Sequence, residues 1–72
     1  MMFQAGEIWK RTSPSIMPVE YWFILSVETY FSPYAGKDIY RVEYMEMGSS
    51  VRADHTFPLD FSLYGNPYFK KV

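Results

Sequence analysis

The chain has 72 residues, and its 7 basic against 8 acidic side chains give a net charge of -1 at pH 7. This length leaves room for one small domain, residues 1–72, and excludes enzymes built from two lobes. The absence of cysteine excludes disulfides and thiolate metal sites and favours a cytoplasmic protein. No apolar run approaches the roughly 20 residues of a membrane span, and the start does not resemble a signal peptide.

Short strands are predicted in place of helices, because five prolines and four glycines interrupt segments rich in Val, Ile, Tyr, Phe and Trp. The expected strands are residues 7–11, 19–31, 38–47, 51–57 and 68–72, joined by a loop at 12–18 and turns at 32–37, 48–50 and 65–67. One helical turn is expected at residues 58–64, because Leu59 and Leu63 are four positions apart. The predicted class is all-β.

The two longest strands are expected to form a hairpin whose turn is centred between residues 34 and 35. Inner positions are then the odd residues from 19 to 31 on one strand and Tyr40, Val42 and Tyr44 on the other. The register pairs Val27 with Val42, Leu25 with Tyr44, Thr29 with Tyr40, Glu28 with Arg41, Ile24 with Met45 and Trp22 with Met47. On the outer face, Glu28 and Arg41 are expected to form an exposed ion pair.

Several segments carry a resemblance to known small domains: residues 6–10 (Gly-Glu-Ile-Trp-Lys), 40–42 (Tyr-Arg-Val) and 58–61 (Pro-Leu-Asp-Phe). With five short strands around them, these segments resemble the SH3-like barrels of short bacterial and bacteriophage proteins. The resemblance implies a small five-stranded SH3-like barrel with one short helical turn before the last strand. By analogy it further implies a binding module of phage type, and the three motifs themselves carry no chemistry.

No arrangement typical of catalysis or of a metal site is found in the sequence. His55 is the single histidine, and Asp54 beside it would point to the opposite face of a strand, so Asp54 cannot orient the imidazole. Ser49 and Ser50 lack a nucleophile elbow, the carboxylates have no ligand spacing, and the glycines form no phosphate-binding loop. We therefore expect no enzyme, no cofactor and no metal.

A strip of large side chains on the outer face of the hairpin is the predicted partner-binding site. It consists of Trp22, Ile24, Arg41, Met45 and Met47. Thioethers beside an indole make an adaptable surface, and Trp and Arg are frequent at binding hot spots. The alternative is simple burial of the strip, because the long second strand of such a barrel bends and joins both sheets.

These observations predict an accessory protein that docks on a host protein or enzyme and modulates or inhibits it. In that case it would act in the host cytoplasm. Nucleic-acid binding through Lys10, Arg11, Lys37, Arg52, Lys70 and Lys71 is the first alternative, although residues 20–46 carry five acids against two bases. A structural or oligomer-forming component is the second alternative.

Overall fold

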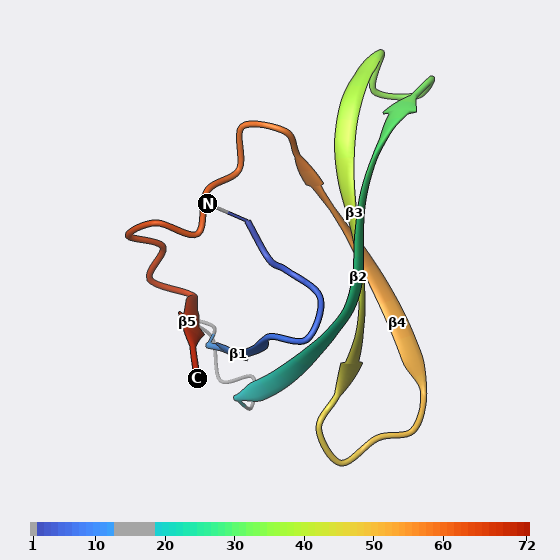
Figure 1. The fold of residues 1–72 in the computed structure, drawn as a ribbon. Coiled ribbons are helices and arrows are strands. Elements are labelled where there is room, and N and C mark those ends of the chain that lie inside the picture. The colour runs from blue at the N-terminus through green and yellow to red at the C-terminus, as the bar shows by residue number, and fades with distance from the viewer. Residues whose placement is uncertain (1, 13–18) are drawn as a thin grey trace.

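The computed structural model describes residues 2–12 and 19–72 and contains one antiparallel sheet with the strand order β4-β3-β2-β1-β5 (Figure 1). The strands are β1 (Ile8–Arg11), β2 (Glu20–Ser32), β3 (Lys37–Glu46), β4 (Arg52–Pro58) and β5 (Phe69–Lys71). The all-β class is confirmed, and the described residues include no helix that could cross a membrane. Apart from Thr12, the loop predicted at 12–18 lies outside the described residues.

The half of the β2–β3 hairpin next to its turn, from Val27 to Ser32 in β2, has the predicted register. Val27 pairs with Val42, Thr29 with Tyr40 and Glu28 with Arg41. The expected ion pair is present, with 2.9 Å between Arg41 Nη1 and Glu28 Oε1. The register is confirmed here, and it places Val27, Val42 and Tyr40 together on the inner face, where they contact the core.

A β-bulge at Leu25 changes the register of the other half of the hairpin. Beyond it, Ile24 pairs with Tyr44, Phe23 with Met45 and Trp22 with Glu46, so the predicted partners of Leu25, Ile24 and Trp22 are wrong. One extra residue in β2 reverses which side chains face inward. Trp22 and Ile24 are therefore buried, whereas Val19, Tyr21 and Phe31, which were predicted in the core, are exposed.

The core lies on the inner face of the bent sheet and is mostly aromatic. Its buried members are Phe3, Trp9, Trp22, Ile24, Val42, Phe57, Leu63 and Phe69. Tyr40 and Tyr44 are partly buried against this core, as their even positions in β3 predicted. Phe3, which was not predicted, lies edge-on to Trp9 and to Phe69, with ring centroids 5.3 and 5.2 Å apart.

The sheet is not closed into a barrel, because the edge strands β4 and β5 do not pair with each other. The N-terminal segment and the chain between β4 and β5 lie across the inner face (Figure 1). The helical turn predicted at residues 58–64 is absent, and the chain there forms turns. Leu63 is buried in the core, whereas Leu59 is 45% exposed. The two leucines therefore do not share one buried face, as the predicted helical turn required.

Candidate functional site

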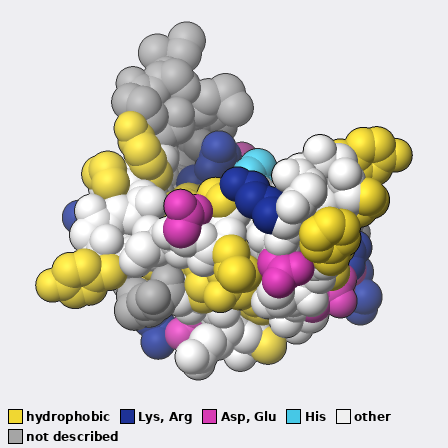
Figure 2. Space-filling view, turned by 90° about the horizontal axis from the view of Figure 1, so that it is seen from above, with side chains coloured by type: hydrophobic (Ala, Val, Ile, Leu, Met, Phe, Trp, Pro, Cys, Tyr) yellow, Lys and Arg dark blue, Asp and Glu magenta, His cyan; other side chains and the backbone are white. Residues whose placement is uncertain are grey.

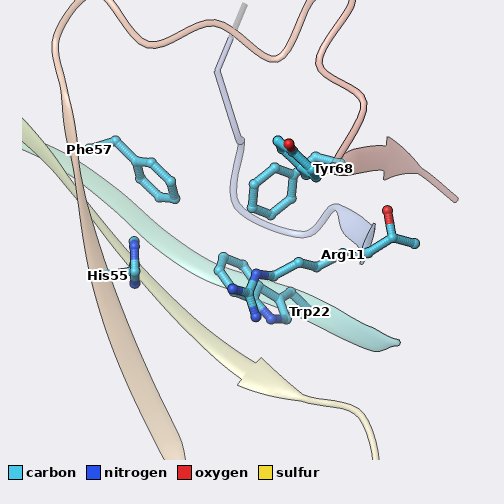
Figure 3. Close-up of a pocket in the computed structure, with 7 residues that line it drawn as sticks. Arg11, Trp22, His55, Phe57 and Tyr68 are labelled. Atoms are coloured by element: carbon cyan, nitrogen blue, oxygen red, sulfur yellow. The ribbon is translucent and has the colours of Figure 1, made fainter. Parts of the chain in front are cut away.

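A pocket of about 230 Å³ opens on the inner face, between the two edges of the sheet. Side chains from β1, β2, β4 and β5 converge on it, together with two residues that flank the strands (Figure 3). Its lining consists of Arg11, Thr12, Trp22, His55, Phe57, Tyr68 and Phe69. The pocket therefore occupies the gap that pairing between β4 and β5 would fill.

Three aromatic rings form the walls of the pocket. Trp22 is 2% exposed, and Phe57 and Phe69 are each 8% exposed. The rings of Trp22 and Phe69 meet edge to face, with centroids 5.3 Å apart. Tyr44 stacks on Trp22 at 3.8 Å and thereby supports the indole from within the sheet. These contacts give the pocket rigid, apolar walls.

Arg11 and Glu20 fix the polar side of the pocket. Glu20 Oε1 accepts hydrogen bonds from Arg11 Nη1 at 3.2 Å and from Trp22 Nε1 at 2.9 Å. The Arg11 guanidinium lies over the Trp22 ring, with Cζ 5.7 Å from the ring centroid (Figure 3). One carboxylate therefore holds both the cation and the indole in place.

Burial raises the pKa of the Tyr44 phenol behind Trp22, and the charge of Glu20 adds to the effect. Tyr44 is therefore neutral at neutral pH.

The rim of the pocket is polar and accessible. The side chains of Arg11, Thr12, His55 and Tyr68 line it, and those of His55 and Tyr68 are exposed. The His55 ring packs against Phe57 with a centroid distance of 4.8 Å. The Thr12 amide donates to the Tyr68 carbonyl at 2.8 Å, which ties the start of β5 to the end of β1. The surface view shows the imidazole reaching solvent near basic side chains (Figure 2).

The structure divides the predicted strip between two faces. Trp22 and Ile24 lie in the core, so their predicted place on the outer face is wrong, and the bulge is the reason. Arg41 lies on the outer face, bound to Glu28 and Asp54 at 2.9 Å each. Met45 is half-buried and Met47 is 56% exposed. Trp22 still lines a concave site, although from the inner face.

Sequence reasoning did not place the rest of the pocket. The alternation of His55 and Phe57 in β4 is a signal that both face inward, as their register partners Val42 and Tyr40 confirm. Arg11 and Phe69 pair across β1 and β5, and this alignment follows from the short closing strand. The approach of β4 to β5 has no local sequence signal, because these strands are not neighbours in the sheet.

The geometry around His55 differs from that of a catalytic dyad. Asp54 points to the outer face, where its Oδ2 accepts bonds from Arg41 Nε at 3.2 Å and Nη2 at 2.9 Å. His55 lies on the inner face in register with Val42. Among residues 2–12 and 19–72, no cluster of three or more His, Asp or Glu side chains could hold a metal ion.

Comparisons of the chain with protein-family models, curated proteins and solved structures found no match.

Proposed function

We propose that the chain is a non-enzymatic binding module that docks on another protein through the pocket between β4 and β5. The observation that supports this function is the combination of rigid aromatic walls with an accessible rim of Arg, His and Tyr. Binding energy concentrates in desolvated aromatic and Arg anchors of this kind. The pocket accepts a projecting side chain, whereas a flat surface of the same composition would not.

The finer assignments belong to the same proposal. We propose that the fold is an open variant of the SH3-like barrel and that the protein is a phage-type accessory factor that modulates or inhibits a host protein. The support is the resemblance of residues 6–10, 40–42 and 58–61, together with the five-stranded antiparallel sheet.

The test is capture of a protein from nuclease-treated host lysate on three immobilised forms: the parent chain, Tyr68→Ala and Tyr34→Ala. Tyr68 lies on the rim, whereas Tyr34 is fully exposed in the turn between β2 and β3 and does not line the pocket. We expect the parent and Tyr34→Ala to retain the same protein and Tyr68→Ala to lose it. Retention by Tyr68→Ala with loss by Tyr34→Ala would place docking at the hairpin tip and overturn the proposal.

A nucleic-acid-binding function is the second candidate, and one observation favours it. Lys10 and Lys70 are register partners on the outer face of β1 and β5, so two cations lie side by side. Binding to a single-stranded oligonucleotide that weakens with salt, and that weakens further in the Lys10→Gln, Lys70→Gln double variant, would establish it. Capture that disappears after nuclease treatment would point the same way.

A further inference from the structure

The chemistry of the pocket rim indicates what the pocket binds. Its polar side chains are a guanidinium, an imidazole, a threonine hydroxyl and a phenol, and no acidic side chain of the described residues lines it. The guanidinium, the imidazole and the phenol are able to donate hydrogen bonds to a ligand, whereas the Thr12 hydroxyl already donates to the Pro67 carbonyl at 3.4 Å. The nearby carboxylate of Glu20 already accepts bonds from Arg11 and Trp22. The rim is thus complementary to an anionic acceptor.

Arg11 lines the pocket and is restrained there by its contacts with Glu20 and Trp22. Within the described part of the chain, its side chain donates to Glu20 through Nη1 alone, and its side chain is 36% exposed. Contact with Trp22 restrains the guanidinium plane. A planar guanidinium binds carboxylates with two parallel N–H groups, and its restraint lowers the entropy lost on binding.

The apolar walls and the small volume define the rest of the ligand. About 230 Å³ is below the roughly 300–1,000 Å³ of sites for drug-sized molecules, so the pocket fits little more than one large side chain. Trp22, Phe57 and Phe69 offer ring surfaces to an aromatic or large aliphatic group. The anionic group and the apolar side chain must therefore lie close together on the ligand.

We infer that the pocket binds the C-terminal residue of a partner chain, with its apolar side chain against Trp22, Phe57 and Phe69 and its α-carboxylate on Arg11. A terminal residue carries both groups on one Cα, and its backbone leaves the pocket in a single direction. An internal acidic residue needs room for a second side chain and for a backbone that leaves in two directions. This inference rests on the proposed docking function and names the partner segment that docks.

The test uses three acetylated peptides and NMR of the indole N–H groups. One peptide is Gly-Gly-Gly-Phe with a free terminal carboxylate, the second is its C-terminal amide, and the third is the amide of Gly-Gly-Phe-Asp-Gly-Gly. We expect the free acid to bind at least about 10-fold more tightly than either amide, as is typical of a charge-assisted hydrogen bond. The Trp22 signal should move more than that of Trp9, which does not line the pocket.

Two matched variants locate the carboxylate. Arg11→Gln should remove the preference for the free acid, whereas Arg52→Gln, the same change of charge at a residue outside the pocket lining, should leave it intact. If Arg11→Gln does not fold, the comparison of acid with amide on the parent chain still decides the question.

Equal binding of acid and amide, both weakened by Tyr68→Ala, would overturn the terminal carboxylate and leave docking at the pocket standing. Equal binding of the internal-acid peptide would overturn the terminal position. Absence of peptide binding, with capture of a protein still dependent on Tyr68, would overturn the inference alone.

Discussion

At the residue scale, Trp22 belongs both to the core and to the candidate site. Its ring is 2% exposed, stacks on Tyr44 and contacts Phe3 and Phe69 as well as the pocket. Any substitution that tests binding at Trp22 therefore also changes packing. The side chains suited to binding experiments are those of the rim, because they contact the pocket without filling the core.

We expect Trp22→Ala to lower the free energy of unfolding by about 3 to 5 kcal/mol, because it leaves a cavity among buried rings. Urea unfolding followed by circular dichroism measures this loss. Tyr34→Ala is the control, since its exposed ring should change stability by less than about 0.5 kcal/mol. An unchanged urea midpoint for Trp22→Ala would contradict the burial of this residue.

Glu7 links three segments through one carboxylate. Its Oε1 accepts from the Gln4 amide at 2.8 Å and from Trp9 Nε1 at 2.9 Å, while its Oε2 lies 2.9 Å from Lys71 Nζ. The hydrogen bond from Lys71 is the largest influence and lowers the pKa of Glu7 below its ordinary value of 4.5, although burial opposes it. The ionised group therefore stabilises the junction of β1 with β5.

Because this pKa is lower in the folded chain, the carboxylate contributes its full stability above pH 4.5 and loses it as the pH falls through the folded-state pKa. We expect Glu7→Gln to lower the free energy of unfolding by about 1 kcal/mol at neutral pH and to have little effect near pH 2. Urea titrations at both pH values measure the difference. Asp60→Asn, at an exposed loop residue without an ion pair in the described ranges, should show no such difference. A constant deficit of Glu7→Gln at every pH would argue for lost packing instead.

At the element scale, the inward-facing residues of β2 change from even to odd numbers at the bulge. Trp22 and Ile24 face the core before it, and Val27 faces the core after it. From Val27 to Ser32 the predicted register with β3 is correct, because Glu28 opposite Arg41 and Val27 opposite Val42 identify the two faces. Between Trp22 and Ser26 every residue but Ser26 is apolar, so alternation does not reveal which residue is extra. The bulge at Leu25 is decided by the fit of Trp22 and Ile24 into the aromatic core, which is a tertiary effect.

The candidate site was predictable only in part for the same reason. The alternation of side chains between the two faces of a strand predicts that the even residues of β3 face inward. It also predicts that Asp54 and His55 point to opposite faces. Both predictions hold because these strands have no bulge. The pocket instead requires Phe57 and Phe69, which lie on opposite edges of the sheet. Their approach depends on how far the whole sheet bends, and no local pattern encodes that.

The turn between β2 and β3 sets the register of the confirmed half of the hairpin. Gly36 has a φ of 68° and its amide donates to the Ser32 carbonyl at 2.8 Å. The buried Ser32 Oγ accepts from the Ala35 amide at 3.2 Å, which holds the turn to β2. Gly36 in this turn therefore adopts the left-handed backbone conformation.

We expect Gly36→Ala to lower the free energy of unfolding by about 1 kcal/mol, because a Cβ is unfavourable at this φ. Gly36→Asn should lose less, since asparagine tolerates the left-handed region. Urea unfolding of the two variants gives the comparison. A loss that is as large for asparagine as for alanine would indicate that something other than backbone conformation matters at this position.

At the scale of the whole molecule, the open side of the sheet is filled by side chains from outside it. β4 and β5 are unpaired edges, and Phe3 lies among the rings of Trp9, Trp22, Phe57 and Phe69 with centroid distances of 5.2 to 6.1 Å. Gly6 and Glu7 extend the attachment, because the Gly6 amide donates to the Ile24 carbonyl and the Ile24 amide to the Glu7 carbonyl, each at 2.9 Å. Through Phe3, the N-terminal segment thus contacts both Phe57 of β4 and Phe69 of β5, the two edge strands that no backbone hydrogen bonds join.

Phe3→Ala tests whether the sheet and the packing of Phe3 between its edges unfold together. Removing a buried phenyl ring should lower the free energy of unfolding by about 3 to 5 kcal/mol, a large part of the stability of a domain this small. Hydrogen exchange should then accelerate throughout the sheet, and first in β5, which is three residues long and, among the described strands, pairs only with β1. Gln4→Ala is the control, because Gln4 is exposed and its bond to Glu7 uses the backbone amide. Faster exchange confined to residues 2–7, with β4 and β5 protected as in the parent chain, would show that the sheet keeps its bend without Phe3.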